Sequence, residues 1–297
     1  MSHKTSHVAV LISNPTRPMI SPELVAAIRA LLPGAGEVRT LDEGIAAEIG
    51  FAGGANLDVL RAMVAHLPLD IALLPATGRR KKLFLADMDS TMIGQECIDE
   101  LADHAGMKAH VSAITERAMR GEIAFEPALR ERVALLKDLP VSVVDAVMAE
   151  RIRLTPGGTE LVRTMRAHGA RTLLVSGGFT LFTSRVAAMI GFDAHRANIL
   201  VTEGERFAGL VEEPILGREA KLAALVELRA ELGLSDDETL AVGDGANDLA
   251  MIGAAGLGVA YHAKPQVAAS AQVRIDHGDL TALLYLQGYA REDFVTA

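Results

Sequence analysis

The chain has 297 residues, half of them hydrophobic, and carries 29 Lys and Arg against 38 Asp and Glu, which gives a formal net charge of −9. A chain of this length is expected to form two domains, or one large domain with insertions. The acidic balance argues against nucleic acid as a partner, because binding to a phosphate backbone depends on clustered Lys and Arg. A small anion can still bind in a locally positive pocket.

Two features bear on where the protein works. Cys97 is the single cysteine, so no intrachain disulfide can form, which fits a reducing compartment. The first residues contain no apolar segment of the signal-peptide kind. No apolar run approaches the roughly 20 residues that a membrane span needs. We therefore expect a cytoplasmic protein with no membrane segment.

Residues 1–80 are predicted to form a small N-terminal domain. Apolar, β-branched runs alternate with helical spacing, and Ser21 stands where a helix N-cap is expected. The predicted elements follow the order β-α-β-β-α-β over residues 7–13, 21–32, 37–40, 46–51, 57–67 and 70–74. This order is typical of a ferredoxin-like α+β domain. The basic run over residues 79–82 is interpreted as a solvated linker.

Residues 81–297 are predicted to form an α/β domain. Apolar strands are expected at residues 83–87, 171–176, 240–244, 257–261 and 273–276. Near-continuous apolar strands separated by helices indicate a parallel sheet covered on both faces. In such sheets the active site lies beyond the carboxyl ends of the strands. Two insertions are predicted, a helical cap at about 94–153 and a hairpin at about 200–213. The cap helices are expected at residues 95–105, 108–120, 126–136 and 143–151.

Two of the predicted strands end in paired carboxylates. Asp87 and Asp89 follow one strand, and Asp244 and Asp248 follow another within the string G-D-G-A-N-D. Burying like charges side by side is costly unless a cation or a catalytic task compensates. One such acidic turn is common, but four carboxylates at two ends of one sheet would make an oxygen site suited to Mg²⁺. A dinucleotide site is not expected, because no G-x-G-x-x-G follows the first strand.

Two further candidates are each weak when taken alone. Ser176 and Gly177 end a predicted strand, where a hydroxyl and backbone N–H groups can face an anion. Gly-Gly is also an ordinary turn. Lys221 lies in the first turn of a predicted helix, and a helix lysine is usually solvated.

Taken together, these motifs resemble the haloacid-dehalogenase-like (HAD) superfamily. The matching parts are D-x-D-x-T at Asp87–Thr91, Ser176, Lys221 and G-D-x-x-x-D at Gly243–Asp248, in the right order over residues 83 to about 285. The set is specific, although each part is not. Within the superfamily, the strings D-M-D-S-T-M-I, V-S-G-G-F and G-D-G-A-N-D are similar to the phosphoserine phosphatases. The resemblance implies a Rossmann-like core with the helical cap inserted after its first strand.

The resemblance also implies a mechanism. Asp87 would attack phosphorus and form an aspartyl-phosphate. Asp89 would protonate the leaving serine oxygen and then activate the water that hydrolyses the intermediate. Mg²⁺ would be held by the Asp87 side chain, the Asp89 backbone carbonyl and Asp244, with Asp248 supporting the shell. The residues implied to bind phosphate are Ser176, Gly177, Lys221 and Asn247.

Selecting phosphoserine requires groups for a zwitterion. A carboxylate is best held by Arg, and an ammonium by a carboxylate. By the family pattern these roles fall to Arg132 and Glu96, while Met119 and Phe125 would exclude water. The residues alone leave other arginines open for the carboxylate, namely Arg117, Arg120 and Arg130.

The N-terminal domain resembles an ACT domain, a module that often binds amino acids. The usual glycine of the first strand–helix loop is missing, and residues 14–18 read N-P-T-R-P instead. Serine binding at this domain is therefore a hypothesis, with homodimer formation or no catalytic role as alternatives. For the whole chain, the rival functions are a phosphatase or phosphotransferase acting on another small ester such as phosphohomoserine, and a silent amino-acid sensor. A dehalogenase would lack the second aspartate of D-x-D, so Asp89 argues against that activity. A P-type ATPase would need membrane spans, and the sequence contains no candidate for one.

Overall fold

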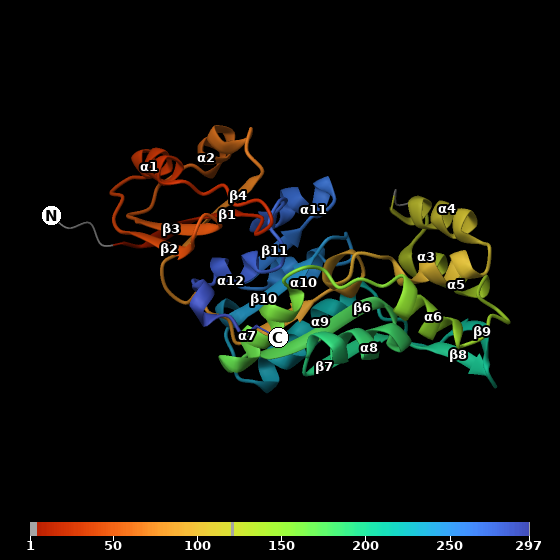
Figure 1. The fold of residues 1–297 in the computed structure, drawn as a ribbon. Coiled ribbons are helices and arrows are strands. Elements are labelled where there is room, and N and C mark those ends of the chain that lie inside the picture. The colour runs from red at the N-terminus through yellow and green to blue at the C-terminus, as the bar shows by residue number, and fades with distance from the viewer. Residues whose placement is uncertain (1–4, 120–121, 297) are drawn as a thin grey trace.

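The structure is a computed structural model that describes residues 5–119 and 122–296, apart from the side chains of Glu116 and Met119. Two large sheets and one two-stranded sheet organise these residues (Figure 1). A four-stranded sheet lies in the N-terminal quarter of the chain, and a six-stranded sheet lies in the rest. Within the described residues, no helix combines the length and apolar character needed to cross a bilayer.

The N-terminal sheet is antiparallel and has the strand order β2-β3-β1-β4. Its elements are β1 (His7–Ser13), α1 (Pro22–Ala30), β2 (Val38–Asp42), β3 (Ala46–Phe51), α2 (Leu57–Val64) and β4 (Leu69–Pro75). The Ser21 hydroxyl accepts a hydrogen bond from the Leu24 N–H at 3.3 Å and so caps α1. The predicted ferredoxin-like order is confirmed.

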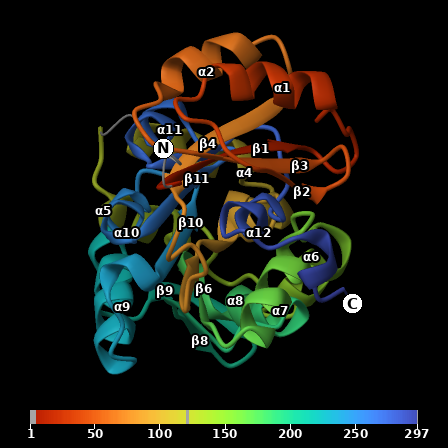
Figure 2. The same ribbon diagram turned by 90° about the vertical axis from the view of Figure 1, so that its left-hand side faces the viewer.

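Both faces of this sheet are covered. Alternate residues of β1 point in opposite directions. Ala9 and Leu11 belong to the core beneath α1 and α2. Val8 and Val10 belong instead to the core that contains α12 (Ala282–Leu286). Figures 1 and 2 show α1 and α2 on one side of the sheet and α12 on the other.

Polar contacts join the same two parts of the chain. Glu48, only 8% exposed, accepts from Arg39 at 3.0 Å and from Arg79 at 2.7 Å. Arg79 also donates to the carbonyls of Tyr285 and Leu286 in the last turn of α12, which are carbonyls that a helix end leaves without intrahelical donors. The interpretation of residues 79–82 as a solvated linker is therefore wrong for Arg79, whose side chain is 10% exposed.

Asp70 in β4 makes a second connection. It is buried and accepts from the backbone N–H groups of Asp276 at 2.8 Å, His277 at 3.2 Å and Gly278 at 2.8 Å. Burial raises the pKa of Asp70, and these three donors oppose that shift. The loop after the last strand of the large sheet is thereby fixed to the N-terminal domain.

The six-stranded sheet is parallel, with the order β12-β11-β10-β5-β6-β7. Its strands are β5 (Leu83–Ala86), β6 (Arg171–Phe179), β7 (Ala194–Asn198), β10 (Thr239–Gly243), β11 (Leu257–Tyr261) and β12 (Val273–Ile275). The helices besides α12 are α7 (Gly158–Ala167), α8 (Thr180–Ile190), α9 (Arg218–Glu231), α10 (Leu249–Ala254) and α11 (Pro265–Ser270). Strand β7 was not among the predicted strands, because its sequence AHRAN has no apolar run.

Helices cover both faces of this sheet, as the apolar strands predict. On one face, Leu83 and Leu85 pack with residues of α9 and α10. On the other, Phe84 and Ala86 pack with residues of α7, α8 and α12. The carboxyl ends of the strands are left for polar residues.

The two insertions lie against each other. The helices are α3 (Cys97–His104), α4 (Lys108–Met119), α5 (Phe125–Ala134) and α6 (Val143–Glu150), and the hairpin is β8 (Leu200–Glu203) with β9 (Arg206–Val211). Backbone hydrogen bonds join Asp138 N–H to Phe207 O at 2.9 Å and Val141 N–H to Glu205 O at 2.9 Å. Figure 1 shows the hairpin beside α6, away from the N-terminal domain. The domain limits at residues 80, 94–153 and 200–213 stay our proposed division of the chain.

Candidate active site

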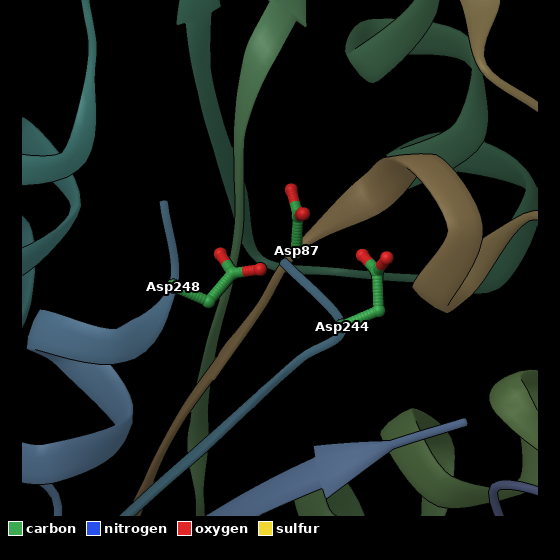
Figure 3. A group of neighbouring side chains, drawn as sticks. All are labelled: Asp87, Asp244 and Asp248. Carbon is green, nitrogen blue, oxygen red and sulfur yellow. The ribbon is translucent and has the colours of Figure 1, made fainter. Parts of the chain in front are cut away.

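Three aspartates meet beyond the ends of two neighbouring strands. Asp87 follows β5 and Asp244 follows β10, and these strands are adjacent and parallel. Asp87, Asp244 and Asp248 are 4%, 8% and 0% exposed. One oxygen of each carboxylate lies within 4.8 Å of the others, and Figure 3 shows Asp244 and Asp248 on either side of Asp87. The structure thus brings these predicted residues together.

Lys221 lies inside this cluster. Its Nζ is 2.7 Å from Asp87 Oδ1 and 2.7 Å from Asp248 Oδ1, and its side chain is fully buried. Burial disfavours the charge, but Asp248 and Asp87 outweigh it and raise the pKa of Lys221. This lysine is therefore a charged member of the site, whereas a helix lysine is usually solvated.

The acidic charge of the cluster exceeds its basic charge. Burial, with Asp248 as a neighbouring charge, raises the pKa of Asp87 well above its ordinary value. The same two causes raise the pKa of Asp244 to about 6. The cluster contains three carboxylates, two of which pair with the Lys221 ammonium, and all the candidate ligand atoms are oxygens. Such a set fits a divalent metal ion of the hard, oxygen-binding class.

Asp248 also determines the shape of the turn. Its Oδ1 accepts from Lys221, and its Oδ2 accepts from the Gly245 N–H at 3.1 Å. A Cβ added at Gly243 would lie 2.3 Å from Asp248 Cγ, so only glycine leaves room for this carboxyl group. Asn247, another predicted residue, is half-buried in the same turn.

Asp89 is not one of the three clustered aspartates and has hydrogen-bond partners of its own. Its Oδ1 accepts from the Cys97 N–H at 2.9 Å, and its Oδ2 accepts from the Ser176 hydroxyl at 3.1 Å. The Ser176 Oγ in turn accepts from the Gly178 N–H at 2.8 Å. Burial raises the pKa of Asp89 against these donors, which favours the protonated form that a general acid needs.

Two oppositely charged side chains approach the site from the helical insertion. Glu96 precedes α3 and accepts from the Ser90 hydroxyl at 2.7 Å. Burial and the charge of Asp89 raise the pKa of Glu96 to about 7. Arg132 is 8% exposed and donates to Ala128 O and Thr115 Oγ1, both at 3.1 Å. Burial lowers the pKa of Arg132, while Asp99, Glu96 and Asp89 oppose that shift.

Burial distinguishes Arg132 from the other arginines that the sequence left open. Arg117 and Arg130 are 44% and 46% exposed and pair with surface glutamates. Arg120 lies outside the described residues. Among the described candidates, Arg132 alone is buried.

Phe125 is half-buried and lies against the phosphate-binding candidates. A Cβ added at Gly177 would lie 3.0 Å from Phe125 Cζ, and one at Gly217 would lie 3.3 Å from Phe125 Cδ1. Two glycines therefore allow the ring to rest on the backbone of the core. Met119 ends α4, but its side chain lies outside the described residues.

The sequence arguments missed two residues near the site. The Lys264 N–H donates to Asp244 O at 3.2 Å, and the Lys264 charge opposes the raised pKa values of Asp244 and Glu96. Asn198, 3% exposed, hydrogen-bonds to the backbone of Gly177 and Leu216. In the sequence, the Lys-Pro pair at the start of α11 is only a weak indication that Lys264 lies near the site. No sequence motif indicates Asn198.

Family models, curated sequences and solved structures all show similarity between this chain and known phosphatases or hydrolases. A family model described as haloacid dehalogenase-like hydrolase matches residues 84–253. A phosphoserine phosphatase from a Polaromonas species is 50% identical over 210 residues, which cover 69% of this chain and 89% of that protein. The unliganded probable phosphoserine phosphatase from Vibrio cholerae has a TM-score of 0.78 at 31% identity, over 99% of this chain and 89% of that one. A solved phosphoserine phosphatase with a phospho-aspartyl intermediate analogue has a TM-score of 0.65 at 39% identity. The match covers 69% of this chain and 98% of that one.

Proposed function

The chain belongs to the haloacid dehalogenase-like hydrolase family, and from this membership we propose that it is a phosphoserine phosphatase. It would hydrolyse O-phosphoserine to serine and phosphate, the last step of serine biosynthesis. One observation carries the proposal. The buried Asp87–Lys221 cluster is accompanied by Glu96 and Arg132, whose opposite charges match the two ends of the amino acid. The 50% identity with a phosphoserine phosphatase supports the same assignment.

Asp87 is the proposed nucleophile. Its contacts with Lys221 Nζ and the Met88 N–H both involve Oδ1. Within the described residues this leaves Oδ2 to attack phosphorus and form the aspartyl-phosphate. The Lys221 charge lies on the other oxygen, where it reduces the repulsion between the carboxylate and an approaching phosphate dianion.

Asp89 is the proposed acid and base. The Ser176 and Cys97 hydrogen bonds orient its carboxyl group, and its raised pKa favours a proton for the leaving serine oxygen. Once it has lost that proton, the same group can take one from the water that attacks the aspartyl-phosphate.

Phosphate binding falls to Ser176, Gly177, Lys221 and Asn247. Mg²⁺, held by the Asp87 side chain, the Asp89 carbonyl and Asp244 with Asp248 in support, would neutralise charge on the transferring phosphoryl group. The crowding of carboxylates around Asp87 supports this choice of site.

The cap residues are proposed to select the amino-acid end. Arg132 uses its Nε and Nη1 for Ala128 and Thr115. Within the described residues this leaves Nη2 as the donor group for a substrate carboxylate. Glu96 would receive the ammonium, and Phe125 with Met119 would close the pocket against water.

Three further assignments are proposals. A homodimer and serine binding at the ACT-like domain rest on the ferredoxin-like topology alone. A cytoplasmic location rests on the single cysteine, which is buried and unpaired. The rival substrate, another small ester such as phosphohomoserine, carries the same two charges as phosphoserine. The silent-sensor alternative is the weaker one, because every proposed catalytic position is filled.

The substrate is tested with phosphoserine, phosphothreonine, phosphohomoserine and a sugar phosphate, each assayed for phosphate release with Mg²⁺. We expect kcat/KM to favour phosphoserine by at least about tenfold over each of the others. Phosphothreonine and phosphohomoserine differ from it by one carbon, a difference that a close-fitting pocket discriminates by about 10- to 200-fold, and a sugar phosphate lacks the zwitterion. Preference for another ester would keep the chemistry and reject the proposed role of the cap. No release from any ester would favour the silent sensor.

Two arginine variants sharpen this test. Arg132→Met is expected to lower kcat/KM for phosphoserine about 100-fold, because a carboxylate loses its buried charged partner. It should leave p-nitrophenyl phosphate, which lacks the amino-acid end, within about threefold of wild type. Arg130→Met, an exposed arginine of the same helix, serves as the matched control. Equal losses on both substrates in Arg132→Met would contradict selection by this residue.

Glu96 gives a pH prediction. A carboxyl group whose pKa is raised to about 7 is charged above that pH and neutral below it. We expect kcat/KM for phosphoserine to fall as the pH drops below about 7, because the neutral acid no longer attracts the ammonium. Glu96→Gln should flatten this limb for phosphoserine and leave the p-nitrophenyl phosphate profile as in wild type. An unchanged phosphoserine profile in Glu96→Gln would rule out the assignment.

A further inference from the structure

Asn198, the last residue of β7, joins two segments of backbone that are distant in sequence. Its Nδ2 donates to Gly177 O at 2.8 Å and to Leu216 O at 3.1 Å. Its Oδ1 accepts from the Leu216 N–H at 2.6 Å. The side chain is 3% exposed, and both ends of its amide are satisfied. A buried amide bonded only to backbone fixes the spacing of the two segments that it connects.

Each of these segments leads to a proposed phosphate-binding group. Gly177 follows Ser176, whose hydroxyl donates to Asp89 at 3.1 Å. Leu216 precedes Gly217, the residue before α9, and Gly217 O accepts from the Lys221 N–H at 3.2 Å. The relative position of Ser176 and Lys221 therefore depends on a connection that runs through Asn198.

The same pair of segments supports the cap. The Phe125 ring rests on Gly177 and Gly217, with the separations given above. If these two glycines moved apart, the ring would lose contact with one of them. Asn198 thus lies beneath both the phosphate-binding groups and the point where the cap meets the core.

We propose that Asn198 is a positioning residue, which holds the Ser176 segment and the start of α9 at the spacing needed for Ser176 and Lys221 to bind one phosphate. The proposal rests on the proposed function, because it takes phosphate as the ligand of these two groups. Within the described residues, the Asn198 side chain forms hydrogen bonds only with backbone groups. Its effect would be carried by geometry, and a displacement of about 1 Å at such a site can cost about 100-fold in rate.

Asn198→Asp is the sharpest test. Aspartate has the same shape and keeps an acceptor for the Leu216 N–H, but it replaces the two donated hydrogen bonds with an oxygen facing two carbonyls. We expect kcat for p-nitrophenyl phosphate to fall about 100-fold and Ki for inorganic phosphate to rise at least about tenfold. Asn198→Ala, which removes the amide without adding charge, is expected to act in the same direction and serves if the aspartate variant does not fold.

Thr172→Val is the matched control. Thr172 is buried at the other end of β6 and exchanges hydrogen bonds of 3.0 Å with Asp193, the residue before β7. This variant should lower the melting temperature, as the loss of a buried hydrogen bond does, while kcat and the phosphate Ki stay within about threefold of wild type. A position that matters only for stability would behave in this way.

The outcomes separate the two proposals. If wild type releases phosphate from no ester, the proposed function fails. If wild type is active and the Asn198 variants keep kcat and phosphate Ki within about threefold of it, positioning by Asn198 is rejected. The same holds if Thr172→Val loses as much activity as Asn198→Asp. Loss of activity with a weakened phosphate Ki in the Asn198 variants alone supports the proposal.

Discussion

Asp87→Asn is expected to lower kcat for phosphate release by at least about 1,000-fold, because an amide oxygen is a poor nucleophile and cannot form the aspartyl-phosphate. The substitution is nearly isosteric and removes one of the crowded buried charges. Lys221 keeps its contact of 2.7 Å with Asp248. The folded state should therefore survive, and the variant should melt within a few degrees of wild type.

The comparison for this variant is Asp145→Asn, which removes a carboxylate that is 70% exposed and paired with Arg185 on the surface. It should retain wild-type activity. Phosphate release from phosphoserine and from p-nitrophenyl phosphate, together with melting curves, gives the measurement. If Asp87→Asn kept more than about a tenth of the rate, another group would have to be the nucleophile.

Removal of divalent metal is expected to abolish phosphate release, and Mg²⁺ added in excess of the chelator should restore it. Without the metal ion, three buried carboxylates face a phosphate dianion, and the Lys221 ammonium pairs with two of them, Asp87 and Asp248. Mg²⁺ should also raise the melting temperature, since a ligand that binds only the folded state stabilises it. This second readout does not depend on turnover.

The Asp244 carboxylate allows a control for the effect of Mg²⁺ on the melting temperature. Its pKa of about 6 in the absence of metal means that protons compete with Mg²⁺ below that pH. The rise in melting temperature should shrink as the pH falls below about 6 and should be lost in Asp244→Asn. Full activity after chelation, with removal of metal checked by elemental analysis, would exclude a metal-dependent mechanism.

The sequence is most informative where apolar strands end in charged residues. Asp87 and Asp244 could be assigned to neighbouring positions because the carboxyl ends of parallel strands meet at one edge of a sheet. Ser21 could be identified as a cap because capping is local in sequence. The ferredoxin-like order followed from strand and helix periods alone.

Other features could not be predicted, because they depend on contacts between distant segments. Asn198 contacts backbone that is 18 and 21 residues away, and no periodic pattern encodes that pairing. Arg79 looked like part of a charged linker, yet its guanidinium is buried against Glu48 and the end of α12. The polar strand β7 has no apolar run to reveal it.

The choice among the cap arginines shows the same limit. Residue type and helical spacing treat Arg117, Arg130 and Arg132 alike. The family pattern indicated Arg132, and the structure gives the physical distinction, because this arginine is buried near Asp89 and Glu96 while the other two pair with surface glutamates. Burial is a property of the packed helices and cannot be obtained from one helix alone.

The sheet that packs on α12 also constrains how the protein can change over evolutionary time. Val8, Val10 and Leu283 belong to one core, so a larger or smaller side chain in either half alters the fit of the other. The two halves should therefore accumulate substitutions in concert. A chimera that takes its first 80 residues from a relative would need the matching α12 as well, and α12 is encoded some 200 residues further along the chain. Exchange of the first 80 residues alone is expected to leave a mismatched interface with α12.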